Sequence, residues 1–373
     1  MTKIKVLVVD DSLLFRRTIV DGISKDPHIE VVAIASDPYE ARDQIIKYRP
    51  DVMTLDIEMP KMNGIEFLKR LMAQYPLPTI MVSAVDSKVF EALVYGAVDF
   101  VVKSNIASSA SLDDFINELI GKIKIASTAC VTIRPPIEKH SNNIDTTSLS
   151  ANSNPSSTIG YATNDVTGKI PSKSSSITST KKSSVDIIVL GASTGGTEAT
   201  EKVTSKLPRD LPPLLIVQHM PPVFTKMYAE RLSRNSKLTI KESESGDILQ
   251  SGYGYVAPGD HHIKIIKNEN QYVIKCFKSD KVNGHMPSVD VLFESAASLF
   301  GSNALAVILT GMGNDGALGM KLLHDQGAYT ITQDESTSVV YGMPKQAFLL
   351  GAADKQSQIE DIPYQIIRQC NKH

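Results

Sequence analysis

Residues 126–184 interrupt the chain, and this interruption constrains most strongly what the remainder can fold into. Ser, Thr, Asn, Pro and Lys dominate the segment, and Tyr161 is its only aromatic residue. Such a composition cannot bury enough apolar surface to offset the entropy lost on ordering, and a buried loop of this length would be unusual. We therefore predict a first domain over residues 1–125, a flexible linker over 126–184 and a second domain over 185–373.

The first domain alternates apolar strand patterns with helical patterns. This alternation predicts a (βα)5, flavodoxin-like α/β fold, a parallel sheet with helices on both faces. The predicted strands are Lys5–Asp10, Val31–Ser36, Val52–Asp56, Ile80–Ser83 and Asp99–Lys103.

The second domain returns to the same kind of pattern, which predicts a doubly wound, mostly parallel α/β sheet. Its predicted strands are Asp186–Leu190, Pro213–His219, Leu238–Glu242, Ala304–Gly311 and Tyr329–Gln333. Three closely spaced runs, Tyr253–Ala257, Ile263–Lys267 and Tyr272–Phe277, predict antiparallel hairpins added to this sheet. Helices are expected over Thr197–Lys206, Thr225–Ser233, Val289–Phe300, Ala317–Asp325 and Pro344–Leu350.

The composition narrows the class of protein. The formal net charge is −2, whereas nucleic-acid binders usually carry a basic excess, so we expect no nucleic-acid partner. No apolar run has the length of a membrane span and no signal peptide is visible, so no direct membrane insertion is expected. The three cysteines, Cys130, Cys276 and Cys370, are far apart, which predicts a cytoplasmic protein with neither disulfides nor a zinc site.

Five polar side chains stand at successive strand ends of the first domain: Asp10, Asp11, Asp56, Ser83 and Lys103. The carboxyl ends of parallel strands share one edge, where ligands usually bind. Three close carboxylates repel one another unless a cation joins them, and an oxygen-only open site suits Mg²⁺. This set is what phosphorylation of Asp56 would need, although a simpler reading makes Asp10 and Asp11 helix caps.

The stretches V-L-V-V-D-D-S, L-D-I-E-M-P-K-M-N-G, M-V-S-A and G-A-V-D-F-V-V-K resemble two-component receiver domains. The resemblance implies that Asp56 accepts phosphate from a histidine kinase. It also implies a Mg²⁺ site made by Asp11, Asp56 and the Glu58 backbone carbonyl, with Asp10 in the outer shell. By the same resemblance Ser83, Phe100 and Lys103 form the switch that responds to phosphate.

In the second domain Ser193, His219 and Asp315 also follow predicted strands. An imidazole can take the proton of a serine, and a carboxylate behind it fixes its tautomer. Ser193 lies on a glycine-rich strand-to-helix turn, which could instead cradle a dinucleotide phosphate. No G-x-G-x-x-G is present, however, and Gln218-His219 stands where an acid would be expected. The order serine, histidine, acid also differs from that of α/β-hydrolases.

The segments L-G-A-S-T-G-G, V-Q-H-M-P, Y-V-A-P-G-D-H-H, G-H-M-P-S-V-D-V-L-F and L-T-G-M-G-N-D-G resemble chemotaxis protein-glutamate methylesterases. The resemblance implies a catalytic triad of Ser193, His219 and Asp315, with backbone amides at Thr194 and Met312 as oxyanion candidates. It implies demethylation of chemoreceptor glutamates, deamidation of certain glutamines, and no cofactor for the esterase. We expect the unphosphorylated first domain to cover the triad.

Two other classes stay open at this point: a non-enzymatic signalling adaptor, and a response regulator that acts on DNA. Three further histidines are weaker site candidates. His261 and His262 follow A-P-G-D and are expected in a turn, and His285 precedes Met286. Loop roles or substrate contacts are expected for all three, because no metal-ligand spacing accompanies them.

Overall fold

A computed structural model describes residues 2–84, 88–103, 109–131 and 185–371. Residues 1–135 and 183–373 belong to one compact unit, which contains both predicted domains. The predicted linker lies outside the described residues from 132 onwards. Before that point, helix α5 (Ser109–Ala126) reaches one residue past the predicted end of the first domain. In the part of the chain that is described, no helix is both long enough and apolar enough to cross a bilayer.

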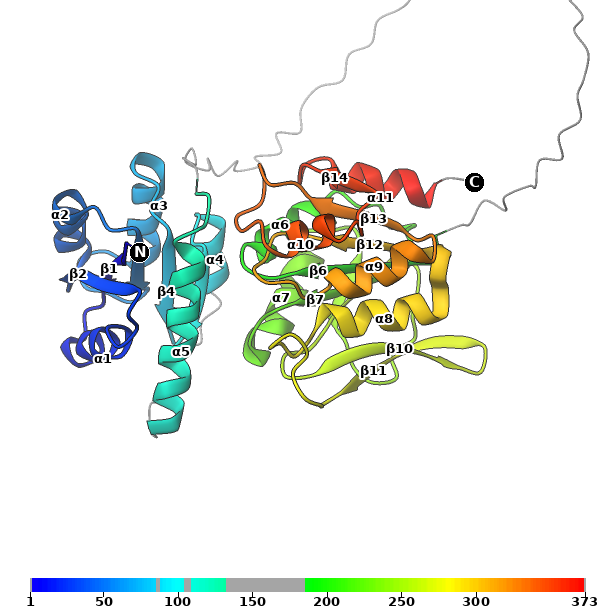
Figure 1. The fold of residues 1–373 in the computed structure, drawn as a ribbon, viewed down its shortest axis with the longest axis horizontal. Helices are drawn as coiled ribbons and strands as arrows, with labels where there is room; N and C mark the ends of the chain where they lie inside the picture. The colour runs from blue at the N-terminus through cyan, green and yellow to red at the C-terminus, as the bar shows by residue number, and fades with distance from the viewer. Residues whose placement is uncertain (1, 85–87, 104–108, 132–184, 372–373) are drawn as a thin grey trace, which may run out of the picture. The chain divides into compact units, whose positions relative to one another are not determined.

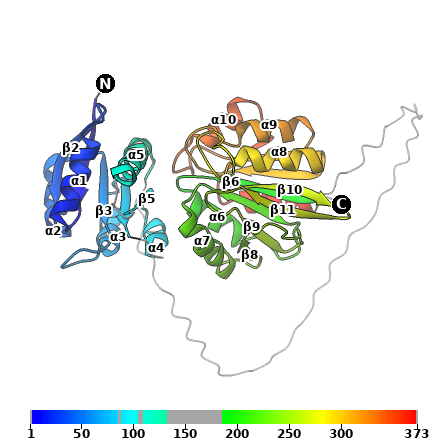
Figure 2. The same ribbon diagram turned by 90° about the horizontal axis from the view of Figure 1, so that it is seen from below.

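The N-terminal domain has a five-stranded parallel sheet in the order β2-β1-β3-β4-β5, as predicted. Its strands are β1 Ile4–Val9, β2 Ile29–Ala35, β3 Val52–Asp56, β4 Thr79–Ser83 and β5 Asp99–Val102. The helices are α1 Leu13–Ile23, α2 Pro38–Tyr48, α3 Gly64–Gln74, α4 Lys88–Val94 and α5. Apolar residues of α1 and α5 pack on one face of the sheet, and those of α2, α3 and α4 pack on the other (Figure 2).

Local sequence explains where several of these helices begin. Ser12, Asp37 and Asn63 are N-caps whose side chains accept hydrogen bonds from backbone N–H groups of the first turn. Short polar side chains are favoured at this position because the first N–H groups of a helix have no partner within it. The Ser12 cap starts α1 directly after Asp10 and Asp11.

The C-terminal domain has a seven-stranded sheet in the order β14-β13-β12-β6-β7-β9-β8, with all neighbours parallel. Its strands are β6 Ile187–Ala192, β7 Leu214–Gln218, β8 Thr239–Glu242, β9 Tyr253–Val256, β12 Ala304–Ile308, β13 Tyr329–Gln333 and β14 Lys355–Ser357. Its helices are α6 Gly196–Thr204, α7 Pro222–Arg234, α8 Val289–Phe300, α9 Ala317–Asp325, α10 Met343–Leu349 and α11 Ile362–Cys370, and η1 Gly301–Asn303 is a 3-10 turn. Helices α8, α9 and α10 cover one face of this sheet, and α6, α7 and α11 cover the other (Figure 1).

One detail of the predicted sheet is wrong. The run beginning at Tyr253 was expected in an antiparallel hairpin, but it forms β9, which lies inside the main sheet parallel to β7 and β8. The other two runs form β10 (His262–Asn268) and β11 (Gln271–Phe277), which pair antiparallel in a sheet of their own. Ile263, Ile265 and Ile274 pack this hairpin into the core beside α8, so burial of its apolar face explains the placement.

Candidate active site

Ser193 lies in the turn between β6 and α6. The Gly196 N–H donates to the Ser193 carbonyl at 2.7 Å, and the Ser193 N–H donates to the Thr310 carbonyl at 3.0 Å. Gly195 has φ +76°, a left-handed conformation that glycine adopts without steric cost. The turn therefore holds a hydroxyl at the carboxyl end of a buried strand and at the N-terminus of a helix.

His219 directly follows β7, which pairs with β6. The side-chain amide of Gln218 donates to the Ser193 carbonyl at 2.8 Å and to the His219 carbonyl at 3.2 Å. One buried amide thus holds together the two backbone segments that carry the predicted nucleophile and base. Sequence reasoning used Gln218 only to argue against a dinucleotide site and missed this role.

Asp315 follows β12 and is only 1% exposed. Its Oδ2 atom lies 2.8 Å from Nε2 of His219. Further donors to the same carboxylate are the Ser288 hydroxyl at 2.7 Å, the backbone N–H groups of Val289 at 2.7 Å and Asp290 at 3.3 Å, and the Asn283 amide at 2.9 Å. The Val289 and Asp290 N–H groups belong to the first turn of α8, where the helix dipole favours an anion.

These donors set the charge of Asp315. Burial acts to raise the pKa of this carboxyl, but hydrogen bonds from His219, Asn283 and Ser288 outweigh it and hold the pKa well below the usual range. Asp315 is therefore a permanent anion at neutral pH, as an orienting acid behind a histidine must be.

The second ring nitrogen of His219, Nδ1, is buried and has no hydrogen-bond partner among the described residues. Ser193 and His219 line the same small cavity, but their side chains are not hydrogen-bonded to each other in the described part of the chain. Catalytic hydrogen bonds are often long without substrate. Because Nε2 is held by Asp315, Nδ1 is the nitrogen left to receive a proton from Ser193.

The predicted oxyanion donors are also at this edge. The backbone N–H groups of Thr194 and Met312 donate to no other described residue. Thr194 is fixed in position, because its carbonyl accepts from the Thr310 hydroxyl at 3.0 Å. Met312 lies in the β12–α9 loop next to Gly311, where an added Cβ atom would come within 2.8 Å of the Ser193 Cβ.

The three remaining histidines have different surroundings. His261 directly follows the turn at Gly259 and Asp260, and its Nδ1 atom lies 3.1 Å from the Gly259 carbonyl oxygen. His262 was also expected in a turn, but it is fully buried at the start of β10, where its Nδ1 accepts from the Ser288 N–H at 3.2 Å. His285 stacks on His219, with ring centroids 3.7 Å apart and an angle of 9° between the planes. Sequence reasoning ranked it as a weak candidate, because local spacing does not reveal a contact between residues so far apart.

The acidic site of the N-terminal domain forms as predicted at its own sheet edge. Oxygen atoms of Asp10, Asp11 and Asp56 lie within 4.8 Å of one another. Nζ of Lys103 lies 2.8 Å from Oδ2 of Asp10 and 2.6 Å from Oδ2 of Asp56. Clustered carboxylates on an open edge have the chemistry of a Mg²⁺ site.

Burial dominates the electrostatics of this cluster. It raises the pKa of Asp56 above the usual range, against the opposing effect of Lys103. Burial would lower the pKa of Lys103, but its interactions with the carboxylates of Asp10 and Asp56 outweigh burial, and the net pKa is raised. Lys103 therefore remains a cation that can face a phosphoryl group.

The predicted switch residues connect this site to the C-terminal domain. Ser83 ends β4 and is buried, and Phe100 of β5 packs edge-on against Phe224 of α7 with centroids 4.8 Å apart. Beside it, the Thr194 hydroxyl donates to Oδ2 of Asp99 at 2.8 Å. The two domains thus touch at the residue that follows Ser193.

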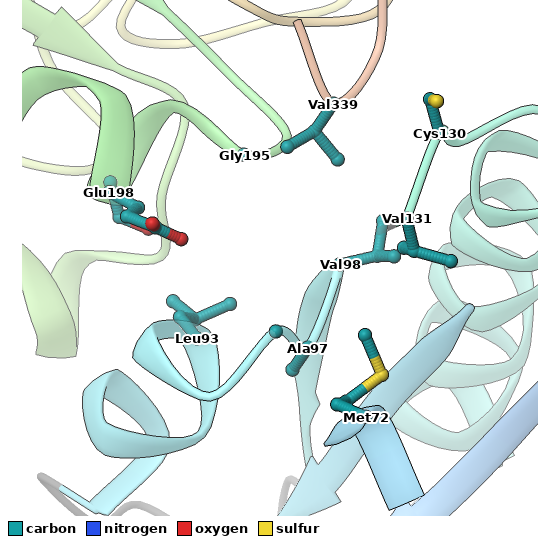
Figure 3. A pocket seen from close by; sticks show the side chains of 11 residues that line it. Met72, Leu93, Ala97, Val98, Cys130, Val131, Gly195, Glu198 and Val339 are labelled. Atoms are coloured by element: carbon teal, nitrogen blue, oxygen red, sulfur yellow. The ribbon is translucent and has the colours of Figure 1, made fainter. Parts of the chain in front are cut away.

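Small cavities lie at this contact, and two of them border the turn that carries Ser193. The one that contains Ser193 and His219 is also lined by Asp99 and Phe100 and has a volume of about 20 Å³, room for roughly one water molecule. The neighbouring cavity, of about 30 Å³, lies where Leu93 and Val98 of the N-terminal domain approach Gly195 and Val339 (Figure 3). Neither cavity could admit a polypeptide substrate.

Comparison with known proteins identifies both domains. The family described as response regulator receiver domain matches residues 6–111, and the family described as CheB methylesterase matches residues 188–366. The protein-glutamate methylesterase/protein-glutamine glutaminase 2 of Syntrophomonas wolfei is 45% identical, over 100% of this chain and 99% of its own length. The corresponding protein of Nitrosomonas europaea is 43% identical, over 98% of this chain and 96% of its own.

A solved structure is similar as well. The catalytic domain of the Thermotoga maritima CheB methylesterase is 40% identical and covers 50% of this chain and 98% of that one, with a TM-score of 0.49. Identity above 40% along the whole length, together with both domain matches in order, decides the family. The chain belongs to the CheB-type protein-glutamate methylesterases/protein-glutamine glutaminases, enzymes of chemotaxis that carry a response regulator receiver domain ahead of the methylesterase domain.

Proposed function

We propose that Ser193, His219 and Asp315 are the catalytic triad of this enzyme and that phosphorylation of Asp56 controls access to it. The observation that carries the assignment is the buried His219–Asp315 pair at 2.8 Å, on the sheet edge that also holds Ser193. The free Nδ1 atom of His219 supports its use as the base.

The chemistry follows from these positions. Nδ1 of His219 takes the proton of Ser193 as Oγ bonds to the γ-carbonyl carbon of a glutamyl methyl ester. The Thr194 and Met312 N–H groups stabilise the oxyanion, and one such donor is worth about 3 kcal/mol. The bond between the former carbonyl carbon and the methoxy oxygen then breaks, and His219 gives its proton to that oxygen so that methanol leaves and the acyl-enzyme remains.

Water resolves the acyl-enzyme by the same route. His219 takes a proton from the water, whose oxygen attacks the acyl carbon, and Ser193 leaves with the proton. Asp315 keeps its negative charge throughout and stabilises the imidazolium in both halves. A glutamine side chain presents the same γ-carbonyl, with ammonia as the leaving group in place of methanol, so deamidation needs no additional residue.

The regulatory half of the proposal concerns the acidic site. Asp11, Asp56 and the Glu58 carbonyl would hold Mg²⁺, with Asp10 in the outer shell, and the ion would neutralise charge during transfer from a histidine kinase. Lys103 would then pair with the phosphoryl group, and Ser83 would move to hydrogen-bond it. Phosphorylation would repack Phe100, and its contact with Phe224 gives that change a direct effect on the methylesterase domain.

The size of the catalytic cavity supports this gating. A space of about 20 Å³ lined by Asp99 and Phe100 admits a water molecule but no glutamyl side chain. The substrates we propose are methylated glutamates on cytoplasmic helices of methyl-accepting chemoreceptors, which places the enzyme in the cytoplasm. Release of the Asp99–Thr194 and Phe100–Phe224 contacts would have to precede catalysis.

Methanol release from methylated receptors tests the proposal. Ser193→Ala should reduce the rate by about a thousandfold or more, whereas Ser205→Ala, at the exposed end of α6, should leave it unchanged. Near-normal turnover by Ser193→Ala would refute the nucleophile. Comparing candidate receptors in the same assay identifies the substrate, and release from none of them would refute the chemoreceptor assignment.

A further inference from the structure

We propose that the tight turn between Val282 and His285 positions the catalytic acid and base: Asn283 orients Asp315, and His285 covers one face of the His219 ring. This inference rests on the proposed triad and adds two positioning residues to it. Neither residue would touch the reacting atoms.

The turn is specified by its own sequence. Val282 and His285 exchange two backbone hydrogen bonds, with N–O distances of 3.1 and 2.9 Å. The two residues between them have positive φ, 52° at Asn283 and 81° at Gly284. This is the arrangement that two-residue hairpin turns require and that Asn-Gly favours. The backbone therefore presents residues 283 and 285 in a fixed relation.

Asn283 contacts the acid. Its Nδ2 atom donates to Oδ1 of Asp315 at 2.9 Å and to Oδ2 of Asp290 at 2.7 Å. One amide thus separates two buried carboxylates that would otherwise repel each other. Together with the Ser288 hydroxyl it binds Oδ1 of Asp315, so that Oδ2 faces His219.

His285 contacts the base. Its ring lies parallel to that of His219 at 3.7 Å, the distance of direct van der Waals contact. Rotation of the His219 ring would break this contact, so the stack keeps Nδ1 in place. It also keeps water from that face of the ring.

The charge state of His285 fits a covering role. Burial, followed by the nearby His219, lowers the pKa of His285 to about 4; Lys281 acts in the same direction and Asp315 opposes it. His285 is therefore neutral near pH 7 and does not repel the imidazolium that forms on His219 during catalysis.

Matched substitutions at His285 separate ring packing from other roles in the full-length protein. His285→Leu fills the volume without a flat ring, and kcat should fall about tenfold with KM within twofold, because the base is no longer held in place. His285→Phe restores a flat uncharged ring and should recover kcat to within about threefold of wild type. His324→Ala, on α9 and away from the triad, is the control.

The contrary outcomes are specific. A rise in KM with unchanged kcat would make His285 a substrate contact, and a His285→Phe enzyme as slow as His285→Leu would show that ring packing is not its role. Asn283→Gly removes the amide while keeping the turn. It should lower kcat about tenfold, and an unchanged kcat would refute the role of Asn283. This variant also tests the turn if His285→Leu does not fold.

A spectroscopic measurement keeps this inference separate from the proposed function. The proton shared by Nε2 of His219 and Asp315 should give a downfield ¹H NMR signal protected from exchange with water. The signal should broaden in His285→Leu and in Asn283→Gly and persist in His285→Phe. It should also persist in Ser193→Ala, whatever that variant's activity. A sharp signal in both His285→Leu and Asn283→Gly would contradict the positioning role, even if Ser193 is the nucleophile.

Discussion

Asp315 and Asp56 lie at the same kind of place, the carboxyl edge of a parallel sheet, and their surroundings are opposite. Asp315 accepts hydrogen bonds from four residues besides His219, and its pKa is held far below normal. Asp56 is buried beside a second carboxylate, with Lys103 as its main partner, and its pKa is raised.

The difference fits the two roles that we propose for these residues. A carboxylate that must remain an anion is surrounded by fixed donors, which need no change during turnover. A carboxylate that must accept a phosphoryl group has few donors of its own and depends on a cation to offset repulsion. The folded protein thus supplies the hydrogen-bond donors that Asp315 needs. Asp56 has fewer such donors, and we expect a bound cation to offset its charge.

Removing the charge of Asp315 should have the largest effect. Asp315→Asn should reduce kcat about 10⁴-fold, because the amide would orient the wrong tautomer of His219. It should also lower the free energy of unfolding by about 3 kcal/mol, since buried donors lose their anion. Methanol release and urea denaturation measure the two, with Asp325→Asn on the exposed side of α9 as control. Normal kcat would show that the donors around Asp315 serve stability alone.

Removing the charge of Asp56 should change stability in the opposite direction. Because the pKa of Asp56 is raised in the folded state, its ionisation opposes folding at pH 7 and this cost fades as pH falls toward 4. Asp56→Asn should therefore add about 1 kcal/mol at pH 7 without Mg²⁺, while activation by a small phosphodonor is lost. Asp43→Asn serves as control. A loss of stability in Asp56→Asn would show that the ionised Asp56, like Asp315, stabilises the folded protein.

Removal of Mg²⁺ should affect stability through the acidic site of Asp56 and not through the site of Asp315. Mg²⁺ at a hundred times its dissociation constant should stabilise the wild-type protein by about 2.7 kcal/mol, and a chelator should reverse this. Asp11→Asn should abolish the effect, whereas Glu58→Gln should keep it, because only the backbone of Glu58 is expected to bind. Thermal denaturation with and without Mg²⁺ measures it. Equal stabilisation of wild type and Asp11→Asn would contradict the site.

The last expected effect concerns the pH dependence of stability that His285 introduces. The unfolded chain binds a proton at this position near pH 6.5 and the folded chain near pH 4. Stability is therefore lost as pH falls from 6.5 toward 4. His285→Phe should remove about 2 kcal/mol of that loss between pH 7 and pH 5. Urea midpoints at the two pH values measure it, and an identical loss in both proteins would mean that His285 titrates normally.

The sheet edges that hold the two sites, and several of the side chains on them, could be predicted from the sequence. Alternating patterns predicted the two parallel sheets, and polar residues after apolar runs predicted which side chains share an edge. Asp10, Asp56 and Lys103 are in contact for this reason, and so are His219 and Asp315. Strand ends can be predicted because an apolar run indicates a buried strand and the polar or turn residues after it indicate where the strand ends.

The remainder depends on contacts that local patterns do not encode. Tyr253–Val256 has the composition of a hairpin strand, but pairing with β7 and β8 is decided by the whole sheet. Gln218, Asn283 and His285 act through side chains that meet residues far along the chain. The residues next to them in the sequence do not indicate such partners, because hydrophobic periodicity predicts burial and not specific side-chain contacts.

The most direct test of the central claim is methanol release by the full-length protein, measured with and without a small phosphodonor, in wild type, Asp56→Asn and Phe224→Ala. We predict that phosphodonor and Mg²⁺ together accelerate the wild type, that Asp56→Asn stays at its basal rate, and that Phe224→Ala is fast without phosphodonor. Equal rates for the wild type with and without phosphodonor, together with a slow Phe224→Ala, would contradict control of the triad by the receiver domain.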